Sequence, residues 1–274
     1  MKLETLHIGP APRIAVDHAG EGPLVVLMHG IGGNRRNWRD QMPVLAAKYH
    51  VVAWDARGYG DSDDYEGPLD FADFNRDLLR VIAHFGVPSA HIVGLSMGGM
   101  IAQNFYRRHP EKFLSLVLAD TRNAFQRHNG AEFLRLREAP LLAGKTPRDI
   151  APGVAKALAG PNCPADALAQ LTESIAVLHK DSYLKTLRYT TLIDEAEEFR
   201  GRNSYVDMDS IRVPTLVICG TEDKTTPPEM SQAMGDGIPG AKLEWIEGAG
   251  HLSNIEDPKR FNEALLGFLD SLPG

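Results

Sequence analysis

Short apolar runs alternate along the chain with segments whose apolar residues recur at helical spacing. Continuous apolar runs cover residues 24–28 and 51–54, and further predicted strands cover residues 91–95, 114–119, 215–219 and 242–246. The helical patterns cover residues 71–85, 97–109 and 258–272. Continuous apolar runs of this length are typical of strands buried on both faces, and strands that alternate with helices form βαβ units. The pattern therefore predicts an α/β fold with a mostly parallel central sheet flanked by helices.

Residues 122–204 interrupt this alternation. They contain no convincing strand, and helical patterns recur at 131–137, 147–158, 165–179 and 183–193. An all-helical insertion between two strands of an α/β sheet is expected above the carboxyl ends of the strands. We therefore predict an α/β core formed by residues 1–121 and 205–274, with residues 122–204 as a helical lid.

A candidate nucleophile lies in Gly94-Leu95-Ser96-Met97-Gly98, which matches G-x-S-x-G. A predicted strand leads into the motif and a predicted helix leaves it, which is the context of a nucleophile elbow. The sharp turn would hold Ser96 in a strained conformation, and small neighbours would let strand and helix approach each other. The alternative is a glycine-rich turn that contains a bystander serine.

The loop at residues 29–33 follows the first long apolar strand and contains three glycines. An oxyanion hole needs one amide from such a loop and one from the residue after the nucleophile, so we predict the backbone N–H groups of Ile31 and Met97. For His29 we favour a structural hydrogen bond. Trp38 is expected to pack against the following helix, with a place in the pocket wall as the alternative.

Among the ten histidines, His251 is the candidate base. It follows the strand at 242–246 through Gly248-Ala249-Gly250, a flexible connection that can reach across the carboxyl edge of the sheet. Asp120 and Asp223 both end strands and both satisfy the order Ser, Asp, His. We favour Asp223 because its strand lies nearer to the histidine-bearing strand, with Asp120 and the neighbouring Glu222 as alternatives.

Composition narrows the range of partners. The 274 residues are 43% hydrophobic with a formal net charge of −7, which suits a globular protein and argues against binding to a phosphate backbone. The N-terminal residues do not form a signal peptide, and no apolar run is long enough to span a membrane. Two cysteines without C-x-x-C spacing indicate a reducing compartment, so we expect the cytoplasm. No pair of histidines has the spacing of a helical metal site.

With Ser96, Asp223 and His251 identified as candidates, the chain resembles the α/β-hydrolase superfamily. The segment 55–62 is similar to the family's D-x-R-G-x-G-x-S turn, and segments 94–100 and 250–256 resemble the 3-oxoadipate enol-lactonase and carboxylesterase branch. The resemblance implies a lid inserted after the sixth strand. It also implies hydrolysis of a small ester or lactone through an acyl-enzyme on Ser96, without metal or organic cofactor.

Three single residues separate the chain from neighbouring branches of the superfamily. Ser96 replaces the aspartate nucleophile of epoxide hydrolases and haloalkane dehalogenases. Leu95 and Leu252 replace the asparagine and tryptophan common in meta-cleavage C–C hydrolases. A C–C bond hydrolase with the same triad stays an alternative, as do a perhydrolase or haloperoxidase-like activity and, outside the enzymes, a ligand receptor with little turnover.

The charge distribution suggests the kind of substrate. Residues 122–204 contain 12 Lys+Arg and 10 Asp+Glu, so the lid is slightly positive whereas the rest of the chain is acidic. This distribution suits a small anionic substrate, and we take Arg122, Arg127 and Arg188 as candidate partners for a carboxylate. Leu252, next to the candidate base, is a further predicted substrate contact.

Overall fold

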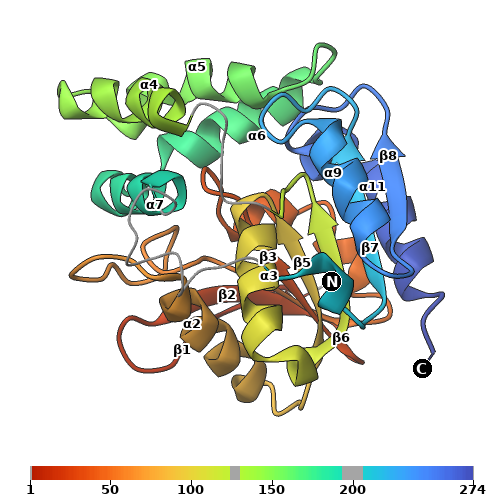
Figure 1. Ribbon diagram of the computed structural model, residues 1–274. Coiled ribbons are helices and arrows are strands. Elements are labelled where there is room, and N and C mark those ends of the chain that lie inside the picture. Colours follow the sequence, from red (N-terminus) through yellow and green to blue (C-terminus); the bar gives the residue numbers. More distant parts are fainter. Residues whose placement is uncertain (1, 124–129, 193–205, 274) are drawn as a thin grey trace.

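The computed structural model describes residues 2–123, 130–192 and 206–273, and these contain an eight-stranded sheet (Figure 1). Its spatial order is β1-β2-β4-β3-β5-β6-β7-β8. The strands are β1 (Glu4–Ile8), β2 (Ile14–Ala19), β3 (Leu24–Met28), β4 (His50–Trp54), β5 (Ala90–Leu95), β6 (Phe113–Ala119), β7 (Thr215–Gly220) and β8 (Lys242–Ile246).

The strands from β4 to β8 in this order pair in parallel, whereas β1 and β2 pair antiparallel with each other and β2 pairs antiparallel with β4. The prediction of a mostly parallel sheet is thus confirmed. The apolar pattern missed β1 and β2. Strand β1 is largely exposed, and Asp17 and His18 interrupt the apolar sequence of β2, so neither forms a continuous apolar run.

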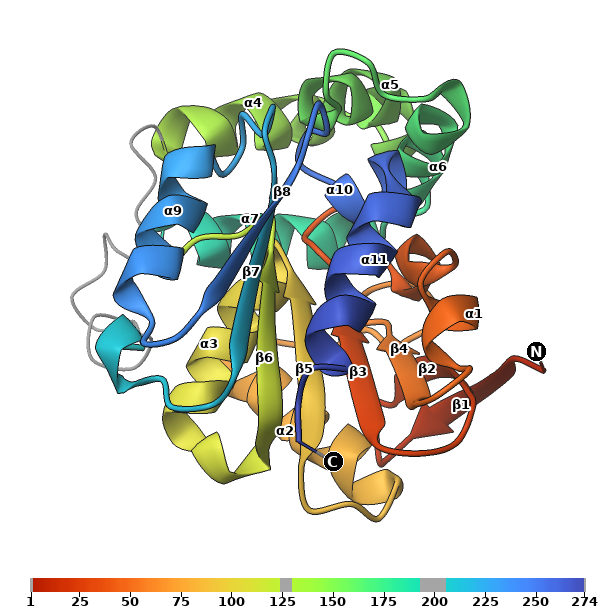
Figure 2. The same cartoon turned by 90° about the vertical axis from the view of Figure 1, so that its right-hand side faces the viewer.

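Helices cover both faces of the sheet. Figure 2 shows α11 in front of the sheet, with α2 and α3 behind it. The core helices are α1 (Met42–Leu45), α2 (Phe71–His84), α3 (Met97–Arg108), α9 (Pro228–Gly237), α10 (Ser253–Glu256) and α11 (Pro258–Leu269). Helix α2 begins at a capping box, in which Asp70 accepts a hydrogen bond from the Ala72 amide and Asp73 accepts one from the Asp70 amide.

Among the described residues between β6 and β7 the chain forms four helices, as predicted for the lid. They are α4 (Gly130–Leu142), α5 (Pro147–Leu158), α6 (Ala165–Ala176) and α7 (Lys180–Leu192), and both ribbon views place them above the carboxyl ends of the strands (Figures 1 and 2). Helix α5 packs against α6, and α4 packs against α7. Helix α4 continues through Pro140, beyond the predicted end at residue 137.

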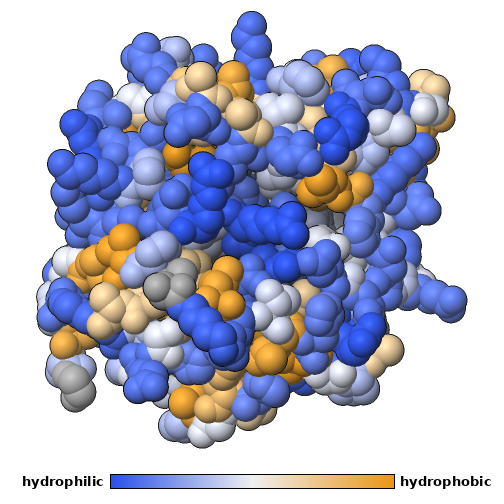
Figure 3. Space-filling model, turned by 180° about the vertical axis from the view of Figure 1, so that it is seen from behind, coloured by the Kyte–Doolittle hydropathy of each residue, from blue (hydrophilic) through white to orange (hydrophobic). Residues whose placement is uncertain are grey.

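The apolar side chains are concentrated between the layers. Trp54, Phe71 and Phe74 are fully buried, and the ring of Phe74 lies near the rings of both Trp54 and Phe71. On the face opposite to that of Figure 1, hydrophobic residues occur in scattered groups among hydrophilic ones (Figure 3). Within the described residues, no helix is both long and apolar enough to cross a bilayer.

Candidate active site

Ser96 lies at the turn between β5 and α3, with φ at 52°. This left-handed conformation is strained for a residue with a side chain. A Cβ atom on Gly94 would lie 2.4 Å from the Gly98 carbonyl oxygen, and one on Gly98 would lie 2.3 Å from the Met28 carbonyl oxygen. Both positions therefore require glycine, which accounts physically for the G-x-S-x-G pattern.

Ser96, His251 and Asp223 form a continuous hydrogen-bonded chain. His251 Nε2 lies 2.9 Å from Ser96 Oγ, and His251 Nδ1 lies 2.8 Å from Asp223 Oδ2. All three residues are buried. Because the carboxylate can only accept, it favours the tautomer with the proton on Nδ1, and that leaves the Nε2 lone pair directed at the serine hydroxyl.

The loop after β7 holds Asp223 through both of its carboxylate oxygens. Oδ1 accepts hydrogen bonds from the amides of Thr225 (2.7 Å) and Thr226 (2.9 Å), and Oδ2 accepts one from the Thr226 hydroxyl (2.7 Å). Burial acts to raise the pKa of Asp223, but His251 and the Thr226 hydrogen bonds outweigh it and lower that pKa. Asp223 is thus ionised beside the imidazole. No pattern in the sequence marks Thr226 as a site residue.

Asp120, the alternative acid, has a different set of partners. It accepts hydrogen bonds from the Gly220 amide (2.9 Å), the Ser253 amide (2.9 Å) and the Ser253 hydroxyl (2.6 Å). Burial and the nearby charge of Asp223 raise the pKa of Asp120 to about 7. Its bonds connect the end of β6 to β7 and α10. The structure therefore joins His251 to Asp223, and Asp120 supports the elements around them.

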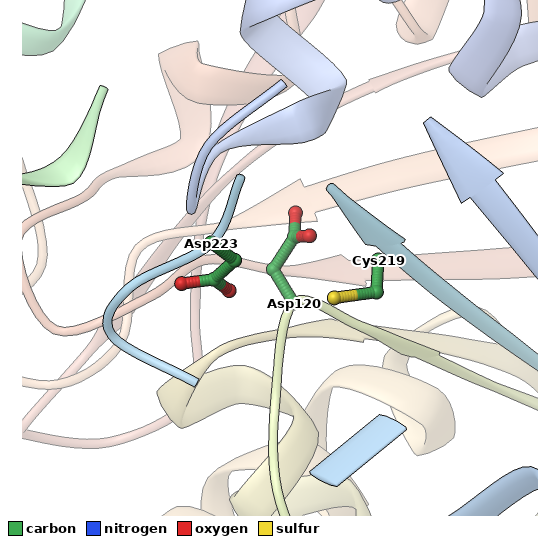
Figure 4. A group of neighbouring side chains, drawn as sticks. All are labelled: Asp120, Cys219 and Asp223. Atoms are coloured by element: carbon green, nitrogen blue, oxygen red, sulfur yellow. The ribbon is translucent and has the colours of Figure 1, made fainter. Parts of the chain in front are cut away.

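Asp120, Cys219 and Asp223 form a buried cluster of possible metal ligands, whose donor atoms lie within 4.8 Å of one another (Figure 4). The carboxylate oxygens already accept the hydrogen bonds described above. Burial also raises the pKa of the Cys219 thiol, whereas metal ligation requires a thiolate. These features suit a hydrogen-bonded acid cluster better than a cation site.

The loop that follows β3 lies directly against the serine. A Cβ atom on Gly30 would be 3.1 Å from Ser96 Cβ. His29 fixes this loop, since its Nδ1 lies 2.7 Å from the Gly30 carbonyl oxygen and its Nε2 accepts a hydrogen bond from the Ala56 amide at 3.0 Å. Burial lowers the pKa of His29, so the ring is neutral and structural. Met97 is the first residue of α3, where helix amides lack intrahelical acceptors.

A pocket lies over Ser96 and His251, between the core and the lid helices. Its described lining is largely apolar and includes Ile31 and Leu252, two of the predicted site residues. The lid contributes Phe133, Arg137, Leu158, Leu171, Ser174 and Ile175. Of these lid residues only Arg137 is charged, and it is not among the arginines predicted from the sequence.

The other predicted substrate contacts lie elsewhere. Trp38 is fully buried and its ring lies against that of Phe261. Arg188 pairs with Glu138 at 2.9 Å, and neither residue lines the pocket. Arg122 is buried outside the described lining, and Arg127 lies outside the described residues.

Backbone and side-chain hydrogen bonds connect the lid to the catalytic loops. The His251 amide donates to the Leu158 carbonyl oxygen at the end of α5 (2.9 Å). Glu256 accepts from the Gly160 amide through Oε2 (2.8 Å) and from the Gly250 amide through Oε1 (3.1 Å). The lid and the histidine loop are thus bonded directly to each other and also through one shared carboxylate.

A second connection joins the lid to the loop after β3. On α6, the Ser174 hydroxyl donates to the Gly32 carbonyl oxygen at 3.0 Å and also lies 3.1 Å from Asn37 Oδ1. Asn37 Oδ1 in turn accepts a hydrogen bond from the Asn34 amide at 2.7 Å. The loop predicted to supply an oxyanion amide is therefore held by the core on one side and by the lid on the other.

The parallel sheet, the strained serine turn and the hydrogen-bonded Ser–His–Asp chain define a hydrolase of the α/β type. The family described as alpha/beta hydrolase fold matches residues 23–258, and the chain belongs to that family. The predicted resemblance is thus confirmed.

Curated relatives of known name align over most of the chain. It is 30% identical over 256 residues to the RutD protein of Azorhizobium caulinodans, whose name provisionally assigns it to carbamate hydrolysis, with 91% of this chain and 92% of that protein covered. It is 27% identical over 266 residues to 3-oxoadipate enol-lactonase 2 of Acinetobacter baylyi, with 93% of each covered.

Solved structures of hydrolases share the fold of this chain. A thermophilic esterase from Thermogutta terrifontis, solved with malate bound, superimposes with a TM-score of 0.83 at 25% identity, over 99% of both chains. A hydrolase from Pseudomonas aeruginosa superimposes with a TM-score of 0.82 at 27% identity, over 98% of both chains.

Proposed function

We propose that this protein hydrolyses a carboxylic ester or lactone through an acyl-enzyme on Ser96. The observation that carries the proposal is the hydrogen-bonded chain from Ser96 Oγ through His251 to Asp223. It lies beneath a largely apolar pocket, which Ser96 and His251 both line. The hydrolase, lactonase and esterase relatives support the same class of reaction.

In the proposed mechanism, His251 Nε2 takes the proton from Ser96 Oγ as the oxygen attacks the carbonyl carbon. Ionised Asp223 holds the imidazole through Nδ1 and stabilises the imidazolium that forms. The backbone amides of Ile31 and Met97 donate to the oxyanion, and the positive end of the α3 dipole adds to this stabilisation. His251 then protonates the leaving group and activates a water molecule that hydrolyses the acyl-enzyme.

We further propose that residues 122–204 act as a lid unit on a core formed by 1–121 and 205–274. The partner is a small molecule, and the sequence-based expectation of an anionic substrate rests on the charge of that lid. We place the reaction in the cytoplasm because Cys163 and Cys219 are both free thiols, as a reducing compartment favours.

The experiment that tests the proposal measures steady-state hydrolysis of a panel of short-chain esters and lactones by the parent protein and by Ser96→Ala. We expect kcat/KM to fall by at least about 10⁴-fold, because a triad nucleophile acts together with its base. A variant within about tenfold of the parent would sink the proposed mechanism, since ordinary packing changes give effects of that size. Ring-cleavage diketones and peroxide-dependent oxidation, assayed in parallel, test the C–C hydrolase and perhydrolase alternatives.

A further inference from the structure

Arg137 on α4 combines three features that no other described lid arginine combines. It lines the pocket above Ser96 and His251. Its guanidinium carbon lies 5.1 Å from the centre of the Phe133 ring, which also lines the pocket. Within the described part of the chain, Arg137 forms no ion pair. A partly buried cation that stacks on an aromatic ring and has no counter-ion is suited to bind an anion.

The neighbouring arginine provides an internal contrast. Arg188 on α7 is bonded to both carboxylate oxygens of Glu138, at 3.0 and 2.9 Å. Glu138 follows Arg137 directly in α4, so the nearest acid in the sequence is already paired with another residue. The fold thereby neutralises Arg188 and leaves the guanidinium of Arg137 available at the pocket.

A groove extends the pocket outward from Arg137. Phe133, Arg137 and Thr225 line both spaces, and the groove has a volume of about 760 Å³. Its walls come from α4, α5 and residues 224–230, with apolar side chains such as Leu136, Ile150, Val154 and Met230. Arg137 thus lines both the pocket over the serine and this larger groove.

The other charges on the groove preserve its positive character. Lys145 and Lys224 line it together with one acid, Asp149. Asp149 accepts hydrogen bonds from the Thr146 amide (2.8 Å) and hydroxyl (2.7 Å), because these residues form the capping box of α5. Asp149 keeps its negative charge there, but the three cations on the groove outnumber it, so the groove as a whole attracts anions.

We propose that the substrate is an ester or lactone bearing a free carboxylate on a short apolar arm, and that Arg137 binds this carboxylate. The inference rests on the proposed function, because it places the scissile carbonyl at Ser96. A carboxylate is favoured over a phosphate because the described lining of the pocket over Ser96 has one guanidinium, that of Arg137, among mainly apolar side chains, which matches a planar monoanion. Arg137 acts in substrate selection, and the triad performs the chemistry.

The test compares monoethyl esters of dicarboxylic acids with two to five methylene groups against the corresponding diethyl esters. The proteins are the parent, Arg137→Gln and, as a matched control, Arg188→Gln. We expect Arg137→Gln to lower kcat/KM for the preferred monoethyl ester by about tenfold or more, mainly through KM, since a charge-assisted hydrogen bond to substrate is lost. Its activity on the diethyl ester is expected within about twofold of the parent, and Arg188→Gln should change neither rate.

Equal losses on charged and neutral esters in Arg137→Gln, or no preference for the monoethyl ester in the parent, would overturn the inference. Arg137→Lys serves if the glutamine variant does not fold, and it should retain an intermediate preference because it keeps the charge without the fork.

A binding measurement separates this inference from the proposed function. The free dicarboxylic acid should slow labelling of Ser96 by a fluorophosphonate in the parent but not in Arg137→Gln. If no ester is hydrolysed, the proposed function fails, and this protection experiment still decides whether Arg137 binds a carboxylate.

Discussion

The carboxyl edge of the sheet and the lid above it were predicted with very different success. Ser96, Asp223 and His251 come from three separate segments, and the structure brings all three together. The lid arginines chosen from charge alone lie away from the described pocket or outside the described residues. Triad side chains follow strand ends, whose positions the sheet fixes, whereas lid side chains depend on how each helix is rotated about its axis.

The glycines around Ser96 illustrate why the serine turn was predictable and the lid arginines were not. A Cβ atom on Gly94 or Gly98 would lie 2.4 or 2.3 Å from a backbone carbonyl oxygen, so the spacing of these glycines reflects the local geometry at Ser96. No comparable backbone constraint in the sequence distinguishes Arg137 on α4 from Arg188 on α7. The packing of α4 against α7 determines that Arg188 pairs with Glu138 and that Arg137 lines the pocket.

The largest effect on kcat should come from replacing one of the two buried acids, Asp223, by asparagine, and the same change at Asp120 is the comparison. Asp223→Asn removes the charge that holds His251, and we expect kcat to fall by about 10⁴-fold. Asp120→Asn should leave kcat within about tenfold and instead lower the free energy of unfolding by about 2 kcal/mol, because one acceptor for the Gly220 or Ser253 donors is lost. Ester kinetics and urea denaturation of both variants measure this. A greater catalytic loss in Asp120→Asn would reverse the assignment of the acid.

A smaller effect is expected where lid and core meet at Glu256. In Glu256→Gln an amide NH₂ must face one of two backbone N–H donors, those of Gly160 and Gly250. We expect kcat to fall by about tenfold with little change in KM, since the histidine loop shifts. The downfield Nδ1 proton of His251, observed by NMR, should shift as well.

The matched control for that variant is Asp257→Asn. Asp257 is the adjacent acid, and it accepts a hydrogen bond from the Arg260 amide at the start of α11, away from the lid. The Asp257→Asn variant should have a lower free energy of unfolding but an unchanged kcat and an unchanged His251 proton resonance. If both variants move that resonance equally, the lid connection has no special role.

The smallest effect concerns Ser174, which joins α6 to the loop at Gly32. Ser174→Ala should lower kcat/KM by about fivefold or less, because one neutral hydrogen bond contributes about 1 kcal/mol. Thr172→Ala on the same helix is the control, since its hydroxyl donates within the helix to the Leu168 carbonyl oxygen. Identical kinetics for the parent and Ser174→Ala would indicate that the core alone holds the loop.

The remaining gaps in the sequence-based account have physical causes. Strand β1 is paired through its backbone and largely exposed, so it carries no apolar signal. Thr226 supports Asp223 through a loop geometry that no periodicity encodes. The predicted ends of the parallel strands and of α5 lie within about one residue of the observed ends. In these elements the sequence pattern reflects the side of the element that is buried.

The central claim, an acyl-enzyme on Ser96, is tested most directly by rapid acid quench during hydrolysis of a turned-over ester, followed by peptide mass spectrometry. In the parent protein we predict a mass increase equal to the acyl group on the peptide that contains Ser96. In a His251→Ala variant given an activated ester, the same acyl-enzyme should accumulate, because loss of the base slows deacylation more than acylation. Full turnover by the parent with no acyl group at Ser96 under any quench time, and with Ser96→Ala still active, would contradict the account.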